Sequence, residues 1–336
     1  MTAREILYLD NAAVRAAMPP VAERIDLAER AMLALVEDAE LPAKIGVHPR
    51  PAGSFAHAMP AYLRTPSIGG DPADGAADLV GIKWVTGVPA NADRGLPAIH
   101  ATVVLTDPLT GQTTAILDGG PITADRTAAV SGVAIRHWAI RAADRPVRVA
   151  ILGAGVQARS HLPVIGALLP GAQVTIIDRH PERSEAVAQA ARQTPGIGRA
   201  MPRADRFDAT SVADVVLTAV SFGPVRQTLT TADLADDALV IAIDYATSVH
   251  SLVATEASLF LVDEVGQFEA NRLAGQFEDY PDPVSTIGRA IRDGTGRPAS
   301  GRVVVSHLGV GLADLVFADA IVRRAMAAGQ GRWLPR

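Results

Sequence analysis

Cysteine is absent from the chain. There is consequently no disulfide, no thiolate metal site and no cysteine nucleophile, and cysteine chemistry says nothing about the compartment. Aromatic residues make up only 4% of the 336 residues, so the cores must consist mainly of alanine, valine, leucine and isoleucine. Long apolar runs are missing as well, and no segment reaches the length of a membrane span. These absences exclude disulfide-stabilised, thiol-dependent and membrane-spanning classes of protein.

Charge of one sign is not concentrated anywhere. The formal net charge is −5, and without a basic block the chain has little that would attract nucleic acid or an anionic membrane. Residues 1–5 lack the apolar core of a signal peptide, so we expect a cytoplasmic protein. No spacing of His, Asp and Glu indicates a metal site, and no serine has the sequence context of a nucleophile elbow.

The length favours two domains, each with its own core. The first third predicts a helix over residues 19–38 and, further on, an antiparallel sheet with strands 80–85, 99–106 and 113–117. Residues 107–111, between the last two strands, are typical of a hairpin turn.

From Thr123 onwards the pattern changes to alternating strands and helices. Thr123 is expected to cap a long helix over residues 124–141. The later strands are predicted at 147–152, 173–177, 215–219, 239–243, 259–262 and 303–305, and the helices at 156–169, 181–193 and 311–328. Such alternation predicts an α/β fold class with a Rossmann-type, doubly wound parallel sheet over residues 124–304. This domain is inserted into an α+β domain formed by residues 1–123 and 305–336.

The loop after the first of these strands carries the pattern Gly153-x-Gly155-x-x-Ala158, with Val156 and Gln157 inside it. An apolar strand precedes it and a helix follows, which is the context that a dinucleotide-binding loop requires. Gly153 permits a tight turn, and Gly155 lets the backbone approach a pyrophosphate at the helix N-terminus. Ala158 is small enough for the helix to pack closely on the strand.

Asp178 lies at the end of the next apolar run and favours NAD, because its carboxylate would bind the ribose hydroxyls and repel a 2′-phosphate. Arg179 and Arg183 lie close enough to receive such a phosphate, so NADP stays open. A further strand ends in a segment that we expect to line the nicotinamide, namely Thr218, Ala219, Val220 and Ser221.

Two cations are candidate substrate contacts. In the strand predicted over residues 80–85, Ile82 and Trp84 share one face, and Lys83 points to the opposite face. Lys83 is either a solvent-facing lysine or a cation that pairs a substrate carboxylate or, with a lowered pKa, moves protons. Arg126 lies in the first turn of its predicted helix, where side chain and helix dipole together suit an anion. The alternative is an ion pair with Asp125 or with a distant acid.

A basic cluster precedes Met59 in a region that reads as loop: Lys44, His48, Arg50 and His57. In an otherwise acidic protein, such a cluster indicates a small acidic substrate. His57 has an ordinary pKa nearest neutrality and is therefore a candidate acid or base.

Asp244 follows the predicted strand 239–243, at the carboxyl end where open α/β sheets bind ligands. It is a candidate for orienting an amine or accepting a proton. The alternative is an aspartate that only forms the turn.

With these residues in view, the chain resembles the ornithine cyclodeaminase/mu-crystallin family along nearly its whole length. Four segments and a C-terminal block carry the resemblance. They are His57-Ala58-Met59-Pro60-Ala61-Tyr62-Leu63; Gly81-Ile82-Lys83 with Asn91 and Gly95-Leu96-Pro97; residues 101–118 with Asp107-Pro108-x-Thr110-Gly111, continuing into residues 123–129; the glycine loop; and Ser306-x-x-Gly309 with Asp314.

The resemblance implies a homodimer, a substrate-binding and dimerisation domain built from both termini, and a site between this domain and the Rossmann domain. It implies that Lys83 and Arg126 contact the substrate carboxylate, and that Lys44 does so where many members carry Arg. We place Met59 among the substrate contacts and Ser306 among the cofactor contacts. Members exchange hydride between nicotinamide and the α-carbon of an amino or imino acid.

Two departures from the cyclodeaminases of this family affect the expected reaction. Those enzymes carry Glu where this chain has His57, and a catalytic Asp in a glycine-rich turn, whereas residues 244–248 contain no glycine. The exchange at His57 removes charge suited to a side-chain amine. We therefore expect an NAD(P)-dependent imino-acid reductase or amino-acid dehydrogenase, in which the cations hold the carboxylate and Asp244 or His57 handles the amine or the proton.

Two other functions remain open. One is an ornithine- or lysine-type cyclodeaminase, which would release ammonia with no net change in NADH. The other is a crystallin-like protein that binds nicotinamide cofactor or a small ligand without turnover. The basic residues Lys44, Arg50 and His57 also suggest a second acidic group on the substrate.

Overall fold

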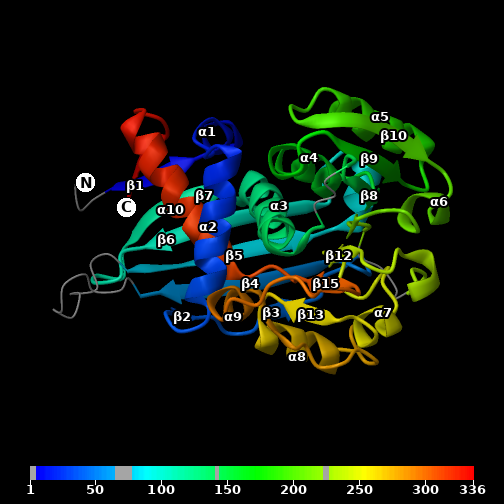
Figure 1. Cartoon of the computed structure of the whole chain (residues 1–336). Coiled ribbons are helices and arrows are strands. Elements are labelled where there is room, and N and C mark those ends of the chain that lie inside the picture. The colour runs from blue at the N-terminus through cyan, green and yellow to red at the C-terminus, as the bar shows by residue number, and fades with distance from the viewer. Residues whose placement is uncertain (1–4, 65–77, 141–143, 222–226) are drawn as a thin grey trace. The chain divides into compact units, whose positions relative to one another are not determined.

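Figure 1 shows the computed structural model of the chain, which describes residues 5–64, 78–140, 144–221 and 227–336. The chain folds into two compact units. Unit 1 consists of Met1–Arg126 and Val310–Arg336, and unit 2 consists of Thr127–Gly309. Within the described residues, no helix is both long and apolar enough to cross a membrane.

Unit 1 contains a mixed sheet of eight strands. The strand order is β16-β1-β7-β6-β5-β4-β2, and β3 pairs with β4. β1 and β7 run parallel, whereas the other pairs are antiparallel. The strands are β1 Glu5–Leu9, β2 Ala39–Glu40, β3 Ile45–Val47, β4 Phe55–Leu63, β5 Leu79–Gly87, β6 Ile99–Thr106, β7 Thr113–Asp118 and β16 Arg332–Pro335.

One face of this sheet is covered by helix α10, which packs against β4, β5, β6 and α2. The helices of the unit are α1 Asn11–Ala16, α2 Val21–Ala34, η1 Pro89–Arg94, α10 Gly311–Ala327 and, up to Arg126, α3 Gly119–Trp138. The register aligns four buried residues across β4, β5, β6 and β7: Met59, Lys83, Val103 and Leu117. A Cβ on Gly311 would lie 2.6 Å from the Met59 carbonyl oxygen, so α10 begins in direct contact with this face. Lys83 therefore stands in an otherwise apolar, helix-covered row.

Helix α3 begins earlier than the sequence pattern predicts. It starts at Gly119, and the Asp118 carboxylate caps it by accepting a hydrogen bond of 2.8 Å from the backbone N–H two residues on. Pro121 fits the first turn because an N–H would have no helical partner there. Thr123 therefore lies inside the helix, and Arg126 lies beyond the second turn, where the helix dipole has fallen off. The predicted contribution of the helix terminus at Arg126 was wrong.

Unit 2 contains a parallel sheet of eight strands in the order β10-β9-β8-β11-β12-β15-β13-β14. The chain order runs outwards from β8 through β9 on one side and from β11 through β12 on the other. Ligands bind at the carboxyl ends of strands beside such a switch point. The strands are β8 Arg148–Leu152, β9 Ala172–Ile177, β10 Ile197–Arg203, β11 Val215–Thr218, β12 Leu239–Ala242, β13 Leu259–Val262, β14 Ser285–Thr286 and β15 Val303–Ser306.

The predicted α/β fold class is confirmed by this sheet and its helices. They are the remainder of α3, then α4 Val156–Leu168, α5 Pro181–Arg192, α6 Phe207–Thr210, η2 Thr231–Asp233, α7 Ser251–Thr255, α8 Val265–Leu273 and α9 Ile287–Arg292. Each strand predicted after residue 146 is found within one residue at each end. Strand β10 was not predicted, because it is an edge strand whose arginines, glycine and proline hide any apolar alternation.

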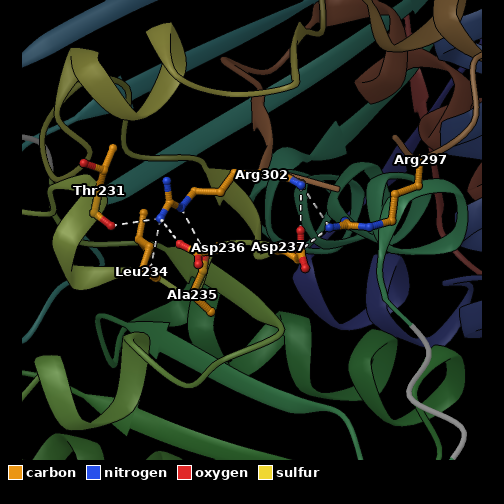
Figure 2. A network of polar contacts seen from close by, with 8 residues as sticks. Thr231, Leu234, Ala235, Asp236, Asp237, Arg297 and Arg302 are labelled. Atoms are coloured by element: carbon orange, nitrogen blue, oxygen red, sulfur yellow. Dashed lines mark hydrogen bonds and ion pairs between the residues drawn. The ribbon is translucent and has the colours of Figure 1, made fainter. Parts of the chain in front are cut away.

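A polar network lies at the amino end of this sheet, where β12 and β15 begin (Figure 2). Arg302 donates to the carbonyl oxygens of Thr231 and Ala235, each at 3.0 Å. Arg297 donates to the carbonyl oxygen of Trp138 at 2.6 Å. These two arginines satisfy backbone carbonyls at the edge of the sheet opposite the loop after β8.

Candidate active site

The loop between β8 and α4 is shaped by two glycines with different surroundings. Gly153 has a φ of +106°, and a Cβ there would lie 2.4 Å from the carbonyl oxygen of Ala219. Gly155 has an extended backbone, and no described heavy atom outside its chain neighbours lies within 4 Å of the position that a Cβ would take. The fold thus requires glycine at 153, whereas Gly155 keeps the space in front of the helix open.

Helix α4 begins directly behind this open space. Its first residue, Val156, is 68% exposed, whereas Ala158 is fully buried. Within the described part of the chain, no side chain caps the helix N-terminus. The first N–H groups and the positive end of the helix dipole are therefore available to an anion such as a pyrophosphate. The Gln157 carbonyl oxygen accepts a hydrogen bond from the buried ring of His161 at 2.6 Å.

Asp178 follows β9 and contacts the same loop. One carboxylate oxygen accepts the backbone N–H of Ala154 and the other that of His180, both at 2.9 Å. A hollow of about 520 Å³ lies beside it and is lined by Ile177, Asp178, Arg179, Ala204, Asp205 and Arg206. Sequence reasoning missed Arg206, because it follows the unpredicted strand β10.

The carboxyl ends of β11 and β12 carry a buried cluster of hydroxyls around one carboxylate. Asp244 accepts hydrogen bonds from Thr218 Oγ1 and Ser248 Oγ, both at 2.7 Å. Burial raises the pKa of Asp244, and the two hydroxyls oppose that rise. The next residue, Tyr245, has a φ of +58°, in the left-handed region. Both oxygens of Asp244 therefore accept a hydrogen bond, one from the neighbouring strand and one from its own turn.

Ser306 ends β15 beside Ala242 of β12. Its hydroxyl oxygen is buried and has no hydrogen-bond partner among the described residues. A buried hydroxyl without a partner is costly, and a polar ligand at this edge would satisfy it. Of the segment predicted to line the nicotinamide, Ala219 donates its N–H to the carbonyl oxygen of Leu152 at 2.7 Å, and Ser221 is exposed.

In unit 1, the two predicted substrate cations share one buried carboxylate. Lys83 Nζ lies 2.6 Å from Asp314 Oδ2, and Arg126 Nε donates to Asp314 Oδ1 at 3.0 Å. The exposed fractions of Lys83, Arg126 and Asp314 are 1%, 5% and 0%. The solvent-facing interpretation of Lys83 is therefore wrong, because α10 covers its side of the sheet. Arg126 pairs with a distant acid, Asp314, as its alternative interpretation predicts. Asp125 pairs instead with Arg24, at 2.8 Å.

This buried group, Lys83, Arg126 and Asp314, contains two cations and one carboxylate. Burial and the charge of Arg126 lower the pKa of Lys83 to about 7, although Asp314 acts in the opposite direction. An excess of buried positive charge is costly unless an anion joins it. The arrangement therefore suits a bound carboxylate.

Met59 and His57 lie on the same sheet face as Lys83. Met59 is the register partner of Lys83, and His57 lies two residues earlier on β4. His57 was expected in a loop, and that expectation was wrong because this segment pairs with β5 over its full length. The His57 ring stacks on Phe55 with ring centroids 4.6 Å apart.

The charge state of His57 follows from this position. Burial and then the positive charges of Lys44, His48 and Lys83 lower the pKa of His57 to about 4. His57 is therefore neutral at pH 7, whereas a histidine with its ordinary pKa would still be protonated to about a quarter. His48 and Arg50 are exposed, whereas the charge of Lys44 also acts on Lys83.

Lysine is rare in this chain. Of its 31 basic residues, only Lys44 and Lys83 are lysines and the others are arginines. Lys83 belongs to the buried group of Lys83, Arg126 and Asp314, and the charge of Lys44 also acts on Lys83. A lysine can lose its proton when buried, whereas an arginine cannot. This composition supports a site in which a titratable amine is used.

Comparison with known proteins places the chain in a family. The sequence profile of the ornithine cyclodeaminase/mu-crystallin family matches residues 21–326. The chain belongs to the ornithine cyclodeaminase/mu-crystallin family. The match includes both the glycine loop and the residues Lys83, Arg126 and Asp314, so the resemblance drawn from the sequence is confirmed.

Two relatives and one solved structure that match over most of their length illustrate this kinship. The nodulation efficiency protein NfeD of Rhizobium meliloti is 28% identical over 296 residues, which cover 87% of this chain and 86% of that protein. A Delta(1)-pyrroline-2-carboxylate reductase of Bacillus cereus is 27% identical over 300 residues, with coverage of 82% and 85%. The Thermococcus litoralis Delta(1)-pyrroline-2-carboxylate reductase, solved with NADH and L-proline, has a TM-score of 0.82 at 22% identity and covers 97% and 99%. This last likeness shows the shared fold.

Proposed function

We propose that the protein is an NAD(P)-dependent oxidoreductase acting at the α-carbon of a small imino or amino acid, as an imine or ketimine reductase or an amino-acid dehydrogenase. The observation that carries this proposal is the buried pair of Lys83 and Arg126 on the single carboxylate of Asp314. Such a site suits the carboxylate that every substrate of this class carries. Kinship with a Delta(1)-pyrroline-2-carboxylate reductase supports the reaction class.

The cofactor that we propose is NAD, with NADP as the alternative. The nicotinamide would supply or accept the hydride. The open space at Gly155 and the uncapped start of α4 fit a pyrophosphate, and the unpartnered hydroxyl of Ser306 fits a polar ligand. Asp178 would bind ribose hydroxyls, while Arg179 and Arg206 in the same hollow would receive a 2′-phosphate.

The residue roles follow from charge and position. The substrate contacts that we propose are Lys44, Lys83, Arg126 and Met59. His57 is neutral at pH 7 and would accept a proton or a hydrogen bond rather than donate a proton as an acid. Asp244 is the second candidate for orienting the amine or carrying the proton. We further propose that the protein acts as a cytoplasmic homodimer.

The test follows the near-UV absorbance of NADH and of NADPH with purified protein. The panel contains preformed cyclic imines, and 2-oxo acids with ammonium or methylamine. Consumption with one substrate class is the expected result, and it identifies the cofactor at the same time. No consumption, with ammonia released from ornithine or lysine, would replace the proposal by a cyclodeaminase. Tight dinucleotide binding without any turnover would instead indicate a protein that binds the cofactor without catalysis.

Replacing Lys83 separates substrate binding from cofactor binding. We expect Lys83→Met to lower kcat/KM about 100-fold or more, because a buried charge-assisted contact to the carboxylate is lost. Dinucleotide affinity, measured by fluorescence titration, should change less than about twofold, because the glycine loop belongs to unit 2 and Lys83 to unit 1. Arg64→Met, which removes an exposed cation of the same unit, should leave both quantities unchanged. Normal turnover in Lys83→Met would rule out the assignment of Lys83.

A further inference from the structure

Asp314 touches both cations of the proposed carboxylate site, and the proposed reaction gives it no direct role. We propose that Asp314 is a positioning residue, which holds Arg126 through Nε and keeps Lys83 protonated so that the two cations bind one substrate carboxylate together. This inference rests on the proposed function, since it concerns how the same site binds its carboxylate.

Helix α10 points Asp314 at the sheet. A Cβ on Gly311 would meet Met59, and a Cβ on Gly81 of β5 would lie 3.2 Å from the side chain of Leu315. Residues 311 and 315 therefore face the sheet, and residue 314 belongs to the same side of the helix. The carboxylate of Asp314 is consequently fixed by the packing of α10 rather than by a flexible loop.

The two carboxylate oxygens are divided between the cations. Oδ1 accepts from Arg126 Nε at 3.0 Å, and Oδ2 lies 2.6 Å from Lys83 Nζ. A guanidinium group has five donors, so the contact through Nε leaves others to bind a second anion. A carboxylate divided in this way sets the spacing of Lys83 and Arg126 before any substrate arrives.

The charge balance around Lys83 makes Asp314 decisive. The charged and titratable groups that act on it from the neighbouring elements are Arg126 of α3, Lys44 ahead of β3, His57 of β4 and Asp314 of α10. Burial, Arg126 and Lys44 all favour the neutral amine, and His57 is itself uncharged at pH 7. Among these described groups, Asp314 alone favours the ammonium form.

A pH dependence follows from this balance. The pKa of Lys83 is lowered to about 7, so its positive charge is present at lower pH and lost as the pH rises through that value. Carboxylate binding should weaken over the same range. In Asp314→Asn the loss should occur at lower pH, so KM for the carboxylate substrate rises at pH 7 to 8 and recovers on acidification, while kcat changes less.

The scarcity of lysine allows a direct measurement that needs no substrate. Protein labelled with ¹³C at the lysine Cε gives one signal for Lys44 and one for Lys83, which Lys44→Arg assigns. We expect the titration midpoint of Lys83 to fall by about one pH unit or more in Asp314→Asn. In Arg126→Gln the midpoint should rise, because a repelling charge is removed. An unchanged or raised midpoint in Asp314→Asn overturns the proposal, whether or not the protein is a reductase.

Two further variants guard against a general loss of structure. Asp263→Asn is the matched control: this buried carboxylate of unit 2 accepts the N–H of Gly309 at 2.7 Å. It is not among the described groups that shift the pKa of Lys83, so the Lys83 midpoint should stay unchanged. If Asp314→Asn does not fold, the double variant Asp314→Asn/Arg126→Gln leaves less uncompensated charge. Its midpoint must lie below that of Arg126→Gln alone, and equal midpoints would contradict the proposal.

Discussion

Two glycines of one loop separate a folding requirement from a binding requirement. Gly153→Ala should lower the free energy of unfolding by about 2 kcal/mol or more, because it combines a positive φ with a close carbonyl contact. Gly155→Ala should change the free energy of unfolding by less than about 0.5 kcal/mol. It should nevertheless weaken dinucleotide binding at least about tenfold by filling the approach to the helix N-terminus.

Urea unfolding and fluorescence titration of NADH measure the two effects of these glycine variants separately. Wild-type stability in Gly153→Ala would show that the turn tolerates a side chain. Normal NADH affinity in Gly155→Ala would show that the pyrophosphate binds elsewhere.

Single residues also mark the limit of prediction from sequence. Alternation along the strand correctly separates Lys83 from Ile82 and Trp84, yet it leaves open which face meets solvent. That answer depends on α10, whose Asp314 is 188 positions from Arg126 in the chain. No local pattern contains such a pairing. The burial of His57 is hidden for the same reason, because the pairing of β4 with β5 and β3 creates its surroundings.

At the scale of elements, a buried polar network joins α3, α4 and the end of β15. Ser131 Oγ lies 2.8 Å from His161 Nε2 and 2.8 Å from His307 Nε2. Burial lowers the pKa of His161 to about 4, against the effect of the Gln157 carbonyl oxygen, so the ring is neutral in the folded protein. In the unfolded chain it would accept a proton near its ordinary value of 6.5.

This difference in the pKa of His161 predicts an acid-sensitive stability. Well above pH 6.5, His161 does not change the free energy of unfolding. As the pH falls from 6.5 towards 4, the free energy of unfolding decreases by up to about 3 kcal/mol. Urea unfolding between pH 4 and 8 measures the slope. In His161→Gln, the slope of the free energy of unfolding against pH should decrease by the contribution of one histidine. Part of the slope should remain, because the pKa of His57 is lowered as well. An identical slope in His161→Gln would contradict the assignment.

Helices and strands are predicted correctly where the segment itself has an apolar pattern. The prediction fails where contacts with another segment determine the structure. The central strands β8, β11 and β12 are nearly all apolar and are found within one residue. Among the described strands, β10 pairs with β9 alone, and it contains arginines, so nothing in its sequence distinguishes it from a loop. The start of α3 was misplaced because Asp118, the last residue of β7, also caps the helix.

At the scale of the whole molecule, the scarce aromatics are unevenly used. Phe260, Phe268, Phe277 and Tyr280 contact one another in the core of unit 2, with ring centroids 4.9 to 6.1 Å apart. In unit 1, the row across the sheet that contains Lys83 consists otherwise of Met59, Val103 and Leu117 and has no aromatic side chain. The two units also divide the proposed function. The buried group of Lys83, Arg126 and Asp314, proposed to bind the substrate carboxylate, belongs to unit 1, and the glycine loop belongs to unit 2.

This division predicts that two ligands protect different parts of the full-length chain from amide hydrogen exchange. NADH should slow exchange at the start of α4 and in the segment after β9, because it would bind the open N–H groups there. A carboxylate substrate found in the absorbance assay should slow exchange in β5 and at the start of α10. Gly155→Ala should remove the first effect and keep the second, and Lys83→Met should do the reverse. Protection of β5 by NADH in Gly155→Ala would place the dinucleotide on the wrong unit and refute this division.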